Sequence, residues 1–111
     1  MRDDRERLLD ILDAIEKIEK YAAKGRKAYD SDELLQSWMV HNVFIIGEAA
    51  AGISENLQEA HSDIPWRKII AMRNILVHAY FRVDPDEIWE VVKNDLPELK
   101  IAVQSLLNSQ P

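Results

Sequence analysis

Residues 33–53 read ELLQSWMVHNVFIIGEAAAGI, and this run decides the fold expected for the 111-residue chain. Its hydrophobic residues occur on nearly every side of a helix, so a helix over residues 31–53 must be covered almost all round. Such a helix lies at the centre of its domain or buries a second face against another subunit. Because a domain of this size cannot easily enclose one helix, we favour a homodimer interface; the sequence alone leaves both arrangements open.

The segments on either side of this run also carry hydrophobic residues at helical spacing. Gly25 is a suitable end for a first helix, and Asp84 followed by Pro85 marks the start of a last one. Pro97 should kink that last helix, because proline cannot donate the backbone hydrogen bond. We therefore predict a single all-α domain, residues 1–111, folded as an up-and-down bundle of four to five helices. The predicted helices cover residues 3–24, 31–53, 65 to 79 or 81, and 85–107, with one helical turn at 57–60.

The composition is that of an ordinary globular protein, with 47% hydrophobic and 31% charged residues. The absence of cysteine excludes disulfides and thiolate metal sites. Residues 1–7 are charged and lead straight into a helical pattern, so no secretion signal is expected. The apolar region 38–53 is interrupted by His41, Asn42 and Glu48, so no membrane span is expected either. We expect a cytoplasmic protein.

The net charge of −6 would by itself argue against a nucleic-acid partner. Its distribution is uneven, however. Residues 64–83 contain no acidic side chain, while Arg67, Lys68, Arg73 and Arg82 give the segment +4 and leave −10 for the rest of the chain. This is the one long segment that would attract an anion.

Within that segment, residues 73–80 read RNILVHAY and place an arginine, an asparagine, a histidine and a tyrosine on one predicted helix. With about 100° per residue, Arg73 and Tyr80 fall on the apolar face that begins at Trp66. Asn74 and His78 share a second face with Arg67. Arg73 and His78 are then about 140° apart, so the arginine must reach around the helix or a second subunit must complete the site. The expected core positions of this helix are Trp66, Ile69, Ile70, Leu76 and Val77.

An arginine on an apolar face must be paired or must open onto a cleft, because its guanidinium does not deprotonate. Glu48 is the only acidic residue between Glu33 and Glu55, so it is the expected counter-ion of Arg73. Purely structural roles also fit each residue: Arg73 can extend its head to water, Glu48 can face solvent, and His78 can favour a helix C-terminus. Tyr80 can likewise be an ordinary core ring.

The chemistry that suits this set is cleavage of RNA without a metal. No nucleophilic serine or cysteine arrangement and no glycine-rich phosphate loop occurs, and His41, His61 and His78 are too dispersed to be metal ligands. Histidine can move the proton of the 2′-hydroxyl or of the leaving oxygen, and arginine can stabilise charge at phosphorus. The reaction usually needs both an acid and a base, and a symmetric dimer would supply a second histidine. Contacts with RNA are expected from Arg67, Lys68 and Arg82.

Residues 73–80 resemble the Arg-x4-His-x-Tyr motif of the HEPN superfamily, in particular the HepT-like toxins that are paired with minimal nucleotidyltransferase antitoxins (the HepT/MntA type). Their surroundings are similar too, over roughly residues 34–107. The matching flanks are residues 64–67 (IPWR), 81–84 (FRVD), 46–49 (IGEA) and 94–97 (NDLP).

The resemblance implies a metal-independent ribonuclease toxin, acting as a homodimer or higher oligomer with both motifs in one cleft. Arg73 and His78 would be catalytic, Asn74 and Glu48 accessory, and no cofactor would be needed. The antitoxin would inhibit the enzyme by transferring AMP to Tyr80, and tRNA is a plausible substrate. The alternatives are a non-catalytic HEPN module that binds a nucleotide or the nucleotidyltransferase, and a purely structural helical dimer.

Overall fold

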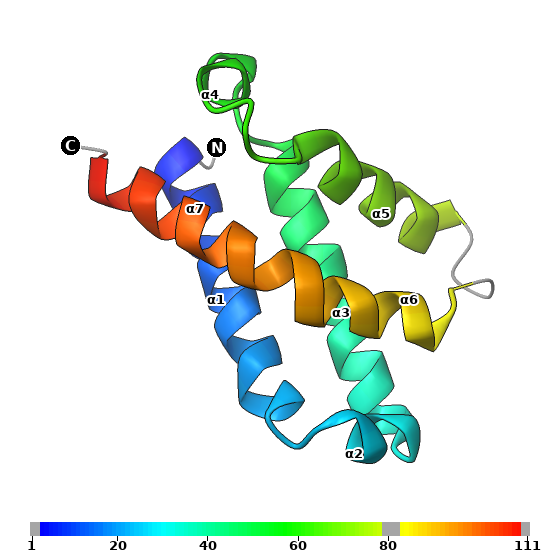
Figure 1. Cartoon of the computed structure of the whole chain (residues 1–111). Coiled ribbons are helices and arrows are strands. Elements are labelled where there is room, and N and C mark those ends of the chain that lie inside the picture. The colour runs from blue at the N-terminus through cyan, green and yellow to red at the C-terminus, as the bar shows by residue number, and fades with distance from the viewer. Residues whose placement is uncertain (1–2, 79–82, 110–111) are drawn as a thin grey trace.

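The computed structural model describes residues 3–78 and 83–109, and within these ranges every regular element is a helix. The all-α bundle expected from the sequence is thus confirmed (Figure 1). Four long helices form its body, and shorter segments connect them. In chain order the elements are α1 (Asp4–Ala22), α2 (Arg26–Asp30), α3 (Glu33–Ala51), α4 (Glu55–Ala60), α5 (Trp66–His78), α6 (Pro85–Glu90), the π-helix η2 (Val91–Asp95) and α7 (Leu96–Ser109).

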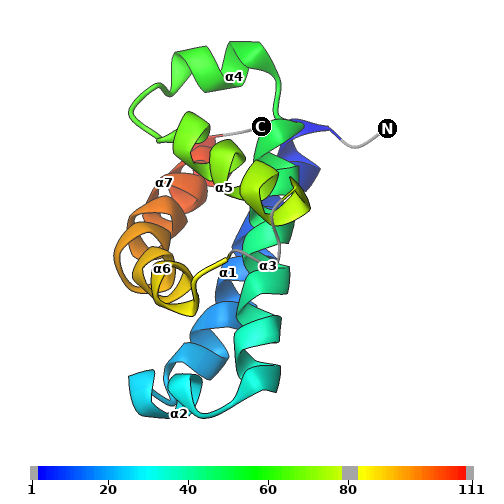
Figure 2. The same cartoon turned by 90° about the vertical axis from the view of Figure 1, so that its right-hand side faces the viewer.

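Helix α3 is the centre of the bundle, as the first of the two predicted arrangements requires. It packs along α1 on one side and α5 on the other, and it also contacts α2 and α6. Figure 2 shows α6 and α7 on one side of α3, while no helix of the described residues covers the opposite side. On α3, Leu34 is 83% exposed and Trp38 is 36% exposed. One chain therefore buries only part of this helix.

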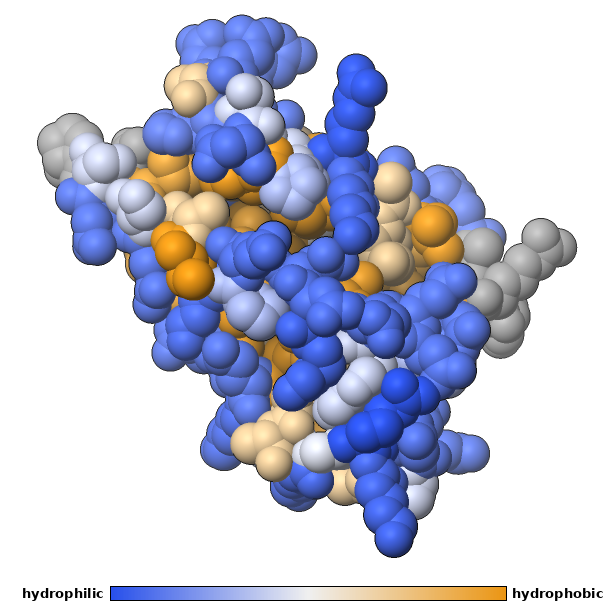
Figure 3. All heavy atoms as spheres, in the orientation of Figure 1, coloured by the Kyte–Doolittle hydropathy of each residue, from blue (hydrophilic) through white to orange (hydrophobic). Residues whose placement is uncertain are grey.

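The hydrophobic core is continuous from α1 through α3 to α7. Besides its apolar members it contains Asn42, which is 1% exposed and donates a hydrogen bond from Nδ2 to the Trp38 carbonyl at 3.0 Å. The face over α6 and α7 is mostly hydrophilic, with hydrophobic side chains visible in the hollow between α7 and α5 (Figure 3). Among the described helices, none combines the length and the apolar character that crossing a membrane requires.

The turn between α1 and α3 differs from the prediction, because residues 26–30 form the additional helix α2. Gly25 ends the first helix as expected and adopts φ of +91°, a conformation that glycine accepts without a steric penalty. Asp32 caps α3, and its carboxylate accepts hydrogen bonds from the Leu34 and Leu35 amides at 3.0 and 3.2 Å. The chain needs these extra residues to turn before α3 can begin.

The last helix is interrupted where the sequence predicted it. Residues 91–95 form the π-helix η2, which separates α6 from α7. Pro97, the second residue of α7, lacks an N–H and its ring would clash with the carbonyl four residues earlier. A π-turn directly before it widens the helix and accommodates the missing bond.

Tyr29 connects α2 to the start of α6. Its ring is fully buried, and its hydroxyl donates to the Pro85 carbonyl at 2.7 Å. Arg26 reinforces the same junction through ion pairs with Asp30 and Asp86. Burial raises the pKa of Tyr29 to about 12, since the phenolate would lose its hydration, and the negative charges of Asp30 and Asp86 act in the same direction.

We predict that Tyr29 makes stability fall at high pH. From its ordinary value of 10.0 up to about 12, the unfolded phenol ionises while the folded one stays neutral. The free energy of unfolding should therefore fall by up to about 1.4 kcal/mol per pH unit across this window. Below the window Tyr29 should cause no such loss. Urea unfolding of wild type and Tyr29→Phe from pH 9 to pH 11.5 measures the difference. A difference between the two proteins that stays constant with pH would contradict the assignment.

Candidate functional site

Helix α5 carries the candidate site, and most of its expected core side is confirmed. Trp66 and Leu76 are buried, and Ile69, Ile70 and Met72 are partly buried against the core. Val77, expected in the core, is 49% exposed. Helix α5 packs mainly on α3, so the side that faces α3 is the one that is covered. The side with Val77 and Asn74 is left facing solvent.

Helices α3 and α5 approach each other closely where Gly47 faces Arg73. A Cβ atom built on Gly47 would overlap the Arg73 Cβ and would lie 3.1 Å from its Cγ and 3.2 Å from its Cα. The aliphatic stem of Arg73 therefore lies directly on the backbone of α3. This contact places an arginine at the edge of the core, with its charged end beside the next residue of α3.

That next residue is Glu48, and it forms the predicted ion pair. Arg73 Nε lies 2.7 Å from Glu48 Oε1, with the side chains 27% and 48% exposed. The Nε is buried, yet its N–H is not aligned with the carboxylate oxygen, so the contact is an ion pair without a hydrogen bond. Glu48 thus balances the charge of Arg73 on the side of its Nε.

Asn74 draws the guanidinium toward the second face of α5. Arg73 Nη1 donates to Asn74 Oδ1 at 2.8 Å. Asn74 and His78 are four residues apart, one turn along the same face, and both are exposed. The hydrogen bond therefore directs the guanidinium toward the face that Asn74 shares with His78. His78 ends α5 and leaves its imidazole accessible.

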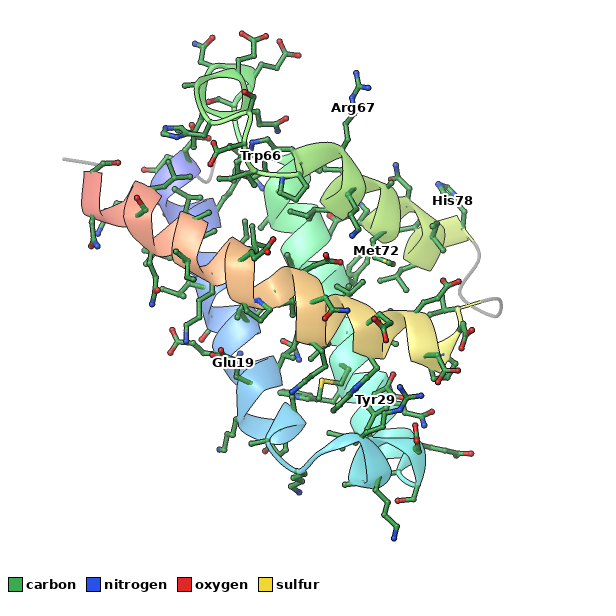
Figure 4. The ribbon with its side chains drawn as sticks, viewed as in Figure 1. Glu19, Tyr29, Trp66, Arg67, Met72 and His78 are labelled. Carbon is green, nitrogen blue, oxygen red and sulfur yellow. The ribbon has the colours of Figure 1, made fainter. Side chains whose placement is uncertain are left out.

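The basic side chains of α5 point in two different directions. Arg67 is exposed and projects from the outer side of the helix, as does His78 (Figure 4). Lys68 instead forms an ion pair with Asp95 of η2 at 2.9 Å, so its charge is directed at α7. Tyr80 and Arg82, the other two site residues expected from the sequence, lie outside the described residues.

His41 is a residue near the site that the sequence reasoning considered only as a metal ligand. It lines a hollow of 220 Å³ together with Ser37, Val40, Phe44 of α3 and Leu76 of α5. It is exposed and lies beside Trp38, with ring centroids 6.4 Å apart. The seven-residue spacing from His41 to Glu48 places both on one face of a helix, and this spacing was the available signal.

The fold and this arginine–histidine site define an all-α bundle with a candidate phosphodiester-cleaving centre on one edge helix. A family model described as "Ribonuclease HepT-like" matches residues 11–106. The chain belongs to this HepT-like family, as the resemblance of its motif implied.

Curated relatives support the assignment. The chain is 38% identical over 100 residues to a protein of Thermococcus cleftensis named "Probable ribonuclease HepT", covering 89% of this chain and 91% of that protein. A Caldanaerobacter subterraneus protein named "Putative RNase TTE0752" is 33% identical over 93 residues, 84% of this chain and 83% of its own length.

A longer relative also matches. The Methanocaldococcus jannaschii protein named "Gamma-glutamylcyclotransferase and putative RNase MJ0434" is 37% identical over 98 residues, which are 87% of this chain and 44% of that protein. The matched part thus spans less than half of this relative. No solved structure matches the chain.

Proposed function

We propose that this chain is a ribonuclease that cleaves RNA without a metal ion, with Arg73 and His78 as its catalytic residues. The observation that carries the proposal is the hydrogen bond from Arg73 to Asn74, which draws the guanidinium to the side of the helix where His78 stands. A phosphate on this face would meet the positive charge of Arg73 beside an accessible imidazole. Family membership supports the same activity.

The proposed reaction uses the 2′-hydroxyl of RNA as the nucleophile. His78 takes the hydroxyl proton or supplies one to the leaving 5′-oxygen, so that no unstable alkoxide has to form. Arg73 stabilises the charge that grows on the phosphoryl oxygens, and it does so from a fixed position because its stem is packed on α3. DNA lacks the 2′-hydroxyl, so the mechanism selects RNA.

Cleavage of RNA in buffer with a metal chelator tests this mechanism. Loss of the proton-transfer group in His78→Ala should lower the rate about 10²- to 10⁴-fold, and Arg73→Ala should lower it about 10²- to 10³-fold. His61→Ala is the matched control, since His61 precedes α5 and it is its backbone carbonyl that accepts the Trp66 indole N–H, at 3.1 Å. Cleavage that stops with chelator, or that survives both site substitutions, would defeat the mechanism.

We further propose that the active form is a homodimer joined through the uncovered side of α3. Leu34, His41 and Glu48 follow one another at seven-residue intervals and so lie along one face, which begins with the 83% exposed Leu34. On α5, the exposed Val77 lies one helical turn after Arg73. A two-fold contact here would bury the apolar side chains of Leu34 and Val77. It would also bring two copies of the site together, each contributing a histidine.

The substitution Leu34→Glu tests the dimer. A carboxylate in the apolar contact would be buried without a partner, so the variant should sediment as a monomer and lose RNA cleavage. Ile101→Glu on α7 is the control, because Ile101 is also exposed, at 70%, and lies on another helix. Sedimentation velocity of the three proteins gives the answer. A monomeric wild type, or equal behaviour of both variants, would rule out this interface.

As part of a toxin–antitoxin pair, the chain would act in the cytoplasm, where its RNA substrates, tRNA among them, are found. A minimal nucleotidyltransferase encoded beside it would act as the antitoxin by transferring AMP to Tyr80. An AMP group on Tyr80 would add bulk and negative charge to the segment that carries the motif, and the added charge would repel an RNA phosphate.

Incubation with such a nucleotidyltransferase and ATP should add the mass of one AMP group per chain of the wild type and none to Tyr80→Phe. Tyr21→Phe is the matched control, since Tyr21 is a partly buried tyrosine of α1, and it should be modified like the wild type. Intact-mass spectrometry reads the result. AMP transfer to the Tyr80→Phe variant would show that another residue is the acceptor.

The second candidate is a non-catalytic module that binds a nucleotide or the nucleotidyltransferase through the same face. The half-buried, positively charged Arg73 beside the exposed His78 supports it equally, because such a face would hold a phosphate whether or not it is cleaved. Nucleotide binding by wild type that cleaves no RNA would establish this candidate over the first.

A further inference from the structure

We propose that Gly47 is a positioning residue for Arg73: its missing side chain sets where the catalytic guanidinium stands. The inference rests on the proposed ribonuclease function of Arg73, but the contact itself can be tested without RNA. Gly47 does not touch a substrate in this proposal. It acts through the arginine stem that lies on it.

The contact is at the root of the arginine side chain, where there is little freedom to yield. A methyl group on Gly47 would overlap the Arg73 Cβ and crowd both its Cγ and its backbone Cα. Rotation about the side-chain bonds of Arg73 cannot move the Cβ or the Cα. Helix α5 would therefore have to shift as a body relative to α3.

Such a shift would act on the guanidinium through its two partners. Glu48 is on α3 and lies 2.7 Å from Nε, whereas Asn74 is on α5 and lies 2.8 Å from Nη1. Movement between the helices changes the first contact and leaves the second intact. The guanidinium would then lose its anchor on α3 and be displaced relative to a phosphate bound on the face of Asn74 and His78.

Gly52 provides an internal comparison on the same helix. A Cβ there would overlap the guanidinium of Arg7, lying 2.6 Å from its Nε. The steric overlap is therefore with the far end of this arginine side chain. A long side chain can swing such an end away without moving the helix that carries it. Gly52→Ala therefore substitutes the same residue type next to an arginine, away from Arg73 and without displacing α5.

The first experiment measures kcat and KM for RNA cleavage. Displacement of a reacting group by about 1 Å can cost about 10²-fold, so Gly47→Ala should lower kcat by about 10- to 100-fold with little change in KM. Gly52→Ala should keep the wild-type kcat. A folded Gly47→Ala protein with wild-type kcat would overturn the proposal.

The second experiment measures melting temperature and needs no activity. Gly47→Ala should lower it in the wild-type background, although alanine is the better helix former. In the Arg73→Gly background, where the overlapping Cβ is absent, the same substitution should lower it little or not at all. Equal losses in both backgrounds would overturn the contact. If wild type cleaves no RNA, the ribonuclease proposal fails, and this comparison still decides whether Gly47 positions Arg73.

Discussion

The close approach of α3 and α5 at Gly47 is the constraint on which the candidate site depends. Wherever two helices pack through side chains alone, an arginine root at the interface would hold them apart or be pushed out to solvent. Here the missing side chain of Gly47 lets the stem of Arg73 occupy the contact. The stem is thus packed like a core residue, while the charged end emerges beside Glu48. Because Gly47 has no side chain, Arg73 can pack its stem against the central helix and still carry its charge at the site.

The ion pair that results is better suited to orientation than to stability. Arg73 is 27% exposed and Glu48 48%, so solvent screens much of their attraction. Pairs of this kind contribute about 0.2–1 kcal/mol, a small part of the stability of a domain. The contact does, however, limit the positions of a long side chain that would otherwise sample many. Together with Asn74 it leaves the guanidinium charged, fixed and open on one side.

The element that carries the site is also the least embedded of the long helices. In α5 only Trp66 and Leu76 are buried, whereas the neighbouring α3 buries eight residues. An edge helix can present Asn74 and His78 to a ligand without exposing the core, because the core is made by α1, α3 and α7. On the central helix, Leu34 and Trp38 are exposed as well, nearer its start than Glu48.

The sequence predicted the long helices well, but it predicted less well how the chain turns between them and which side of each helix is buried. The four long helices and the interruption before Pro97 follow from hydrophobic spacing and from proline chemistry, which act locally. The helix α2, the cap at Asp32 and the exposure of Val77 were missed. Each depends on how the chain turns or on which neighbours a helix meets, and spacing along one segment carries no information on either. The pairing of Glu48 with Arg73 was predictable because an arginine on an apolar face needs an anion nearby.

By itself, then, the sequence determined that the protein is helical, that residues 33–53 hold an apolar helix covered on more than one side, and that Arg73, Asn74 and His78 share one segment with HepT-like flanks. It left open whether the same chain or a second subunit covers that helix. Local hydrogen bonding and side-chain periodicity suffice for those conclusions. Only the tertiary structure decided where Arg73 lies, because its stem rests on Gly47 and its guanidinium pairs with Glu48, both on another helix and 25 or more residues earlier in the chain. Contacts between distant segments, rather than propensities within one, gave the site its shape.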